Sequence, residues 1–142
     1  MRENRMGLLI KKISEHIEKQ VNFEVKKYNL TMTQVRVIVF LFRKEGRVAT
    51  QKEIELFMEV AHPTIVSIIS SLEKKGFVRC CFDENDHRMK NVYLIWGGNV
   101  EIYQEMRQTM FSISDQLVQD FTEDEKKAFA RFLERAYTNS KK

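Results

Sequence analysis

Residues 62–95 constrain the fold most, because a helical segment there runs directly into two strand-like segments. The helical segment begins at Pro63 and ends at Lys75, with Gly76 after it, and Pro and Gly are favoured at these two boundaries. Two runs of β-type residues follow, 77–82 and 91–95, on either side of a charged turn. A helix that leads into a hairpin with a charged tip predicts a winged helix. Such a helix suits the major groove of DNA, and the tip can reach the neighbouring minor groove.

Three capping boxes mark the starts of further helices. In each box a Thr side chain and a Glu or Gln three residues later bond each other's free backbone amides. The boxes are Thr31 with Gln34, Thr50 with Glu53, and Thr122 with Glu125. Apolar residues three or four apart predict two longer helices, over 9–28 and 103–121. The predicted fold is mainly α with a small β-hairpin wing (α+β): a winged helix-turn-helix over 31–96 between N- and C-terminal helices at 1–30 and 98–142.

The terminal helices carry more apolar surface than one small winged helix can cover. The residues concerned are Leu9, Ile13 and Ile17 in the first helix, and Phe129, Phe132, Leu133 and Tyr137 in the last. On a monomer they would form an exposed apolar patch, and packing against a second copy is the simplest way to bury it. The alternative is that these helices pack wholly on their own domain. We predict a homodimer held by the terminal helices.

Composition narrows the class of protein further. The chain has 142 residues and a net charge of +4, which permits an anionic partner. No apolar run approaches the roughly 20 residues needed to span a bilayer, and the first residues do not resemble a secretory signal. We therefore expect a cytoplasmic protein without membrane contact. The two cysteines, Cys80 and Cys81, are adjacent and lack the spacing of a redox or zinc motif, so reduced thiols are expected.

Two further motifs lie at the junction of helix and hairpin and at the hairpin tip. They are Leu72-Glu73-Lys74-Lys75-Gly76-Phe77-Val78-Arg79 and a tip with Asp83, Asp86 and Arg88. Together with Leu30–Gln34 and Thr50–Ile54, they resemble the MarR family of bacterial transcriptional regulators over essentially the whole chain. The resemblance implies that residues 1–142 form a single MarR-type domain, with a DNA-binding lobe between dimerisation helices.

Two positions depart from the family pattern. Asn85 stands where the wing usually carries an Arg, which removes one cation from the tip. Ile95-Trp96 stands where a Thr commonly caps the fifth helix, so Gly98 or Asn99 has to take over that role. Neither departure changes the predicted fold.

The resemblance implies a sequence-specific DNA-binding transcriptional regulator and not an enzyme. It implies a ligand-responsive repressor that binds a pseudo-palindromic operator in double-stranded DNA as a homodimer. The alternative is a winged-helix module for protein association without DNA readout, because residues 43–90 hold nine basic and eight acidic side chains. A gel shift with promoter fragments separates the two.

Three groups of residues are expected to contact DNA. On the wing, Arg88 enters the minor groove, Asp86 holds Arg88 or closes the turn, and Lys90 lies near a phosphate. The residues that the helix turns toward the major groove are His62, Pro63, Thr64, Val66, Ser67 and Ser71. The phosphate contacts are Thr50, Gln51 and Lys52, with Arg36 a weaker candidate. A solvated charged turn and an exposed Ser/Thr helix face are the alternatives that involve no DNA.

A small-molecule effector is expected between the DNA-binding lobe and the dimer helices, as in relatives that bind phenolic acids. The weak candidates for its pocket are His16, Tyr28, Phe40 and Tyr103, each of which is also an ordinary core residue. No metal site or cofactor is expected, because the three histidines are too far apart in sequence for the spacing of a zinc helix. No catalytic constellation or phosphate loop is present, which agrees with a non-enzyme.

Overall fold

The computed structural model describes residues 4–95, 97 and 99–142, and these residues fold into mainly helical structure with one small antiparallel sheet. They divide into two compact units, the first ending at Thr109 and the second beginning at Met110. The fifth helix, α5 (Asn99–Leu117), crosses from one unit into the other. The predicted fold class is confirmed. The boundaries expected at residues 96 and 98 lie outside the described residues.

Four helices precede the hairpin in the first unit, and their N-termini follow the sequence signals. They are α1 (Met6–Val25), α2 (Met32–Arg43), α3 (Gln51–Met58) and α4 (His62–Lys74). One 3-10 turn, η1 (Lys26–Tyr28), follows α1, and another, η2 (Glu45–Arg47), follows α2. Thr31 and Thr50 make complete capping boxes at the starts of α2 and α3. Asn29 ends η1 in the left-handed conformation, which Asn tolerates better than most residues.

The turn between α3 and α4 has the geometry of a helix-turn-helix. Glu59 closes α3 with a left-handed backbone (φ 54°), and the chain bends by 115° between the two helices. Among the described residues no single helix is long and apolar enough to cross a membrane. The pair of α3 and α4 meets that criterion only when the two are taken together across their bend.

The sheet has three strands in the order β1-β3-β2, which are β1 (Val48–Thr50), β2 (Val78–Phe82) and β3 (Lys90–Leu94). The hairpin strands pair in antiparallel register from Val78 opposite Leu94 to Phe82 opposite Lys90. β1 was not predicted, because three residues directly before a capping box carry no alternation that a pattern search can detect. Its pairing with β3 attaches the hairpin to the segment that leads into α3.

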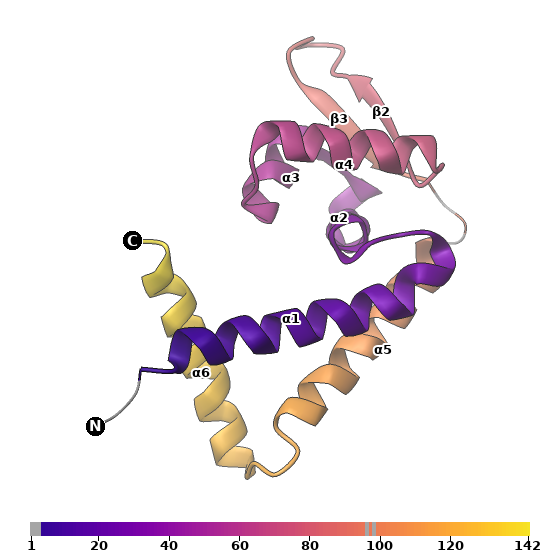
Figure 1. The fold of residues 1–142 in the computed structure, drawn as a ribbon. Coiled ribbons are helices and arrows are strands. Elements are labelled where there is room, and N and C mark those ends of the chain that lie inside the picture. Colours follow the sequence, from indigo (N-terminus) through magenta and orange to yellow (C-terminus); the bar gives the residue numbers. More distant parts are fainter. Residues whose placement is uncertain (1–3, 96, 98) are drawn as a thin grey trace. The chain divides into compact units, whose positions relative to one another are not determined.

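The core of the first unit surrounds α2, which contacts both α1 and α4. Figure 1 shows α2 between α1 on one side and the pair of α4 and the hairpin on the other. The side chains with almost no exposed surface include Val37, Ile38, Leu41, Ile54, Ile65, Ile69, Leu72 and Val92. Because Ile65, Ile69 and Leu72 fill this core, the opposite side of α4 is left exposed.

The side-chain amide of Gln34 joins the start of α2 to the end of α4. Its Oε1 accepts from the amide of Thr31 (3.1 Å) and from Nζ of Lys75 (3.2 Å), and its Nε2 donates to Oγ of Ser71 (3.0 Å). Lys75 also donates to the carbonyl of Asn29, in the loop before α2. Gln34 is buried, so these partners replace the water that its amide would otherwise bind.

Replacing Gln34 by leucine should lower the free energy of unfolding by about 1–3 kcal/mol, because a cap and a buried polar network are lost together. Urea unfolding followed by circular dichroism measures the change. Gln20→Leu, at an exposed position of α1, is the matched control and should change stability by less than about 0.5 kcal/mol. Equal effects of the two substitutions would show that the Gln34 network adds nothing to stability.

Asn99 anchors the start of α5 to the sheet. Its Nδ2 donates to the carbonyls of Ile95 and Phe77, and its side chain is buried. Helix α5 begins at Asn99, so Asn99 is a helical residue and not the cap that precedes the helix. Gly98, the other expected cap, lies outside the described residues. The second unit contains the end of α5 and α6 (Glu123–Ser140). There Thr122 makes the third predicted capping box, and Phe121 and Phe129 meet edge to face.

Candidate nucleic-acid interface

The wing tip is a tight turn closed by its own backbone and by two aspartates. The amide of Asp83 donates to the carbonyl of Met89 (2.8 Å), and the amide of Met89 donates to the carbonyl of Asp86 (2.9 Å). Asp86 Oδ1 accepts from the backbone amide of Arg88 (3.0 Å) and from its Nε (3.2 Å). The Arg88 side chain remains 93% exposed, so its two terminal nitrogens project into solvent from a rigid turn.

The exposed side of α4 presents mostly small hydroxyl-bearing or apolar side chains. The exposed residues include His62, Pro63, Thr64, Val66 and Ser67. Ser71 differs from the others, because it is half-buried and its hydroxyl accepts from Gln34. Ser70 and Lys74 are exposed as well, although the sequence prediction omitted them. Their spacing from Ser67, three and seven residues on, places them on the same side of the helix and could have identified them.

A side-chain bond joins α3 to α4 across the turn between them. Nδ1 of His62, the first residue of α4, bonds Oε1 of Glu55 on α3. The His62 side chain is 65% exposed and that of Glu55 is 22% exposed. Sequence reasoning selected His62 alone, because nothing in the spacing of the two residues indicates that they meet.

The predicted phosphate contacts lie at the start of α3 and on two neighbouring elements. The Thr50 hydroxyl is occupied as a cap, accepting from the amide of Glu53 (3.1 Å). Lys44 bonds Glu53 (2.8 Å), and this bond holds the pKa of the Glu53 carboxyl below its ordinary value. Gln51 is half-buried and its Oε1 has no partner in the described structure. Lys52 and Arg36 are exposed and Lys90 is half-buried, so Lys52 and Arg36 are better placed to meet a phosphate than Thr50, whose hydroxyl already caps α3.

The four residues proposed for an effector pocket each have a different environment. His16 is exposed on α1. The Tyr28 hydroxyl bonds Glu105, which also bonds Lys27, and burial together with this bond raises the pKa of Tyr28 to about 12. Phe40 stacks on Phe57 with ring centroids 4.4 Å apart, and Tyr103 stacks on Phe42 at 4.1 Å. Arg43 Nε donates to the Tyr103 hydroxyl (3.4 Å) and lowers its pKa. The pocket stays a prediction, because each of these contacts is an ordinary packing contact.

The thiols occupy neighbouring positions of the edge strand β2. Cys80 is half-buried and Cys81 is exposed. Burial raises the pKa of the Cys80 thiol, with Glu73 adding to the effect. The described residues contain no group of three His, Cys, Asp or Glu side chains placed to hold a metal ion.

The comparisons with known proteins identify the family. Residues 28–89 match the model of the MarR family. Over 117 residues the chain is 31% identical to the uncharacterised HTH-type transcriptional regulator YwoH of Bacillus subtilis (strain 168), covering 82% of each protein. The chain belongs to the MarR family. It is also 26% identical to the HTH-type transcriptional regulator SarZ of Staphylococcus haemolyticus (strain JCSC1435) over 96% of this chain and 90% of SarZ.

Solved structures agree with this assignment to the MarR family. The crystal structure of MarR is 26% identical, has a TM-score of 0.79, and aligns over 95% of this chain and 96% of that one. The DNA complex of S. aureus MepR has a TM-score of 0.87 at 19% identity over 96% of this chain and 99% of MepR, which shows the shared fold. This MarR-family chain is therefore a winged-helix transcriptional regulator.

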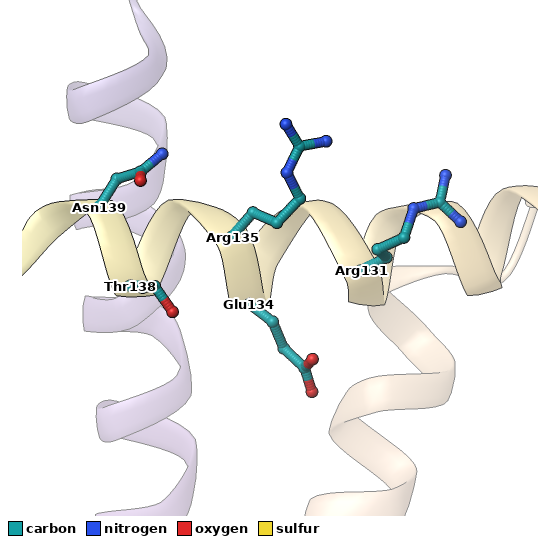
Figure 2. Close-up of a pocket in the computed structure, with 5 residues that line it drawn as sticks. All are labelled: Arg131, Glu134, Arg135, Thr138 and Asn139. Atoms are coloured by element: carbon teal, nitrogen blue, oxygen red, sulfur yellow. The ribbon is translucent and has the colours of Figure 1, made fainter.

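A hollow lies on α6. Figure 2 shows that Arg131 and Arg135 point to one side of the helix and Glu134 to the other, with Thr138 and Asn139 one turn further on. All five lining residues belong to one helix, so a molecule resting there would keep most of its surface in water. We assign this hollow no ligand.

Proposed function

We propose that this protein binds double-stranded DNA in a sequence-specific manner, as a homodimer on a pseudo-palindromic operator. The observation that carries the proposal is the joint exposure of the α4 face and of Arg88 at the tip of the adjoining hairpin. The two recognition helices of a dimer would enter major-groove half-sites about one turn, ~10 bp, apart, with each wing in the flanking minor groove. Two proteins of this fold, S. aureus MepR and the C80S mutant of E. coli MarR, have structures with DNA.

The homodimer is supported by apolar side chains that each unit leaves exposed. On α1 these are Met6, Leu8, Leu9, Ile10 and Ile13; on α6 they are Phe132, Leu133 and Tyr137. Such faces on two helices exceed the scattered exposure that is usual for a soluble protein. A second copy related by two-fold symmetry offers the same apolar residues in return.

Replacing Arg88 by alanine should weaken DNA binding by about 1–3 kcal/mol, roughly 5- to 150-fold, because the tip of the wing then has no guanidinium for the minor groove. Fluorescence anisotropy with a labelled promoter fragment measures this loss. Arg88→Lys is the matched variant and should recover part of the affinity, since it keeps the charge but not the planar fork. An affinity that is unchanged in Arg88→Ala would remove the wing from the mechanism.

We extend the proposal to a ligand-responsive repressor located in the cytoplasm and without enzymatic activity. The support is the resemblance to the MarR family, in which a ligand can act only by favouring the state that it binds more tightly. A reporter gene placed behind the bound promoter would show lower expression with the protein present. A rise in expression would indicate an activator instead.

A second candidate function is protein association through the winged helix. It is favoured by the near balance of charge over residues 43–90 and by the absence of Arg, Asn and Gln from the α4 sequence. DNA binding driven by phosphate contacts weakens steeply between about 50 and 200 mM salt. A gel shift with promoter fragments at both concentrations decides between the two functions, because an association module would shift none of them.

A further inference from the structure

We propose that Glu55 is a positioning residue that orients the imidazolium form of His62 to donate a hydrogen bond from Nε2 to a guanine in the major groove. The inference rests on the proposed DNA-binding function and names the contact that would distinguish one base from another. Neither residue lies in the wing, so the contact is independent of Arg88.

The bond between the two helices fixes the orientation of the imidazole. Glu55 lies on α3 and is mostly covered, whereas His62 begins α4 and is mostly exposed. Nδ1 of the ring is engaged by Glu55 Oε1. Because the two ring nitrogens point away from each other, Nε2 is directed away from α3. The N-terminal residues of a recognition helix are those that reach base edges.

The chemistry of the pair determines what Nε2 can offer. An ionised carboxylate only accepts hydrogen bonds, so Nδ1 must carry the hydrogen that faces Glu55. Only the imidazolium form of His62 carries a proton on Nε2 as well, and the His62–Glu55 pair then has no net charge. The exposed nitrogen becomes a charged donor without leaving a lone cation between two helices.

A donor at this position favours guanine over the other purine. Guanine presents two acceptors, N7 and O6, on its major-groove edge, whereas adenine presents N7 beside an amino donor. The other exposed groups at this end of α4 are Pro63, Thr64 and Val66, which offer a hydroxyl and apolar surface. His62 is thus the strongest donor that the first turn of α4 brings to the groove.

The pair also explains why a carboxylate can lie beside a surface proposed to meet phosphates. Without His62, Glu55 would face the polyanion unpaired, and juxtaposed like charges cost several kcal/mol. His62→Ala should therefore weaken binding more than Glu55→Ala/His62→Ala does. This non-additivity separates the pair from two residues that act independently.

The experiment uses a duplex of roughly 30 bp that the wild-type protein selects from a random-sequence pool, which spans two half-sites with flanks. Each guanine is replaced in turn by 7-deazaguanine, which removes the N7 acceptor and keeps Watson–Crick pairing. Binding to wild type should fall roughly tenfold at one guanine in each half-site. In His62→Ala and in Glu55→Ala the same replacement should have little or no effect. Lys52→Ala is the control and should lower affinity for every duplex while keeping the wild-type pattern.

The outcomes distinguish this inference from the function on which it rests. If the wild-type protein enriches no duplex, the proposed DNA binding itself fails. If a duplex is bound but no guanine shows a 7-deaza effect that His62→Ala removes, the His62–Glu55 contact alone is wrong. Circular dichroism checks that each variant folds, and Glu55→Ala carries the same test should His62→Ala not fold.

Discussion

Replacing Leu133 by glutamate should raise the dissociation constant of the dimer roughly a thousandfold, about 4 kcal/mol, and operator binding should be lost with it. Leu133 is 49% exposed in the single chain and lies between Phe132 and Tyr137 on the apolar face of α6. Two-fold symmetry places each substitution in the interface twice, and a buried charge without a partner costs several kcal/mol. A monomer retains only one recognition helix and one wing, so its affinity for a two-half-site operator collapses.

Analytical ultracentrifugation over a range of protein concentrations measures the dissociation constant directly. Thr138→Glu is the matched control, because it adds the same charge to an exposed position on the opposite side of α6. The control should remain a dimer and bind DNA like the wild type. A Leu133→Glu protein that still sediments as a dimer would show that the α6 face does not form the interface.

Replacing Ser67 by glutamate should lower DNA affinity at least about a hundredfold, roughly 3 kcal/mol, without unfolding the protein. Ser67 is exposed in the middle of the α4 face, between Val66 and Ser70 along the helix. A carboxylate there would enter the groove between two rows of phosphates, where like charges cost several kcal/mol. The repulsion should weaken as salt is added, so the difference in affinity between Ser67→Glu and the wild type should shrink although both bind DNA less tightly.

Two variants at the same position isolate the charge from the size of the side chain. Ser67→Gln has nearly the shape of glutamate but no charge, and Ser67→Ala removes only the hydroxyl. Anisotropy titrations should place Ser67→Ala within about tenfold of the wild type, Ser67→Gln next, and Ser67→Glu far below both. Equal affinities for Ser67→Gln and Ser67→Glu would mean that this side of α4 does not approach the phosphates.

Local signals predicted most of the fold because the atoms that satisfy them lie close together in the chain. Thr31, Thr50 and Thr122 each bond a backbone amide three residues away, and all three predicted boxes are present. The same local character made the helix boundary at Pro63 and the hairpin after Gly76 predictable, since both depend on backbone preferences of single residues.

The features that could not be predicted depend on the tertiary arrangement of the chain. β1 forms only because Val48–Thr50 pairs with β3, which lies more than forty residues further along the chain. Ser71 was assigned to the groove on helical spacing, and only the structure shows that Gln34 holds its hydroxyl. The bond between Glu55 and His62 needs the 115° bend of the chain to exist, so no spacing rule could reveal it. The effector pocket stays a prediction, since aromatic side chains alone do not specify their neighbours.

Thr50 belongs to two elements at once. It is the last residue of β1, where it pairs with Asn91, and it is also the N-cap of α3. No linker residue separates the hairpin from the helix pair. The wing and α4 therefore have little freedom to reorient relative to each other before the protein binds DNA. Most of the conformational entropy of this β1–α3 junction is lost when the chain folds. DNA binding therefore does not have to order the junction a second time.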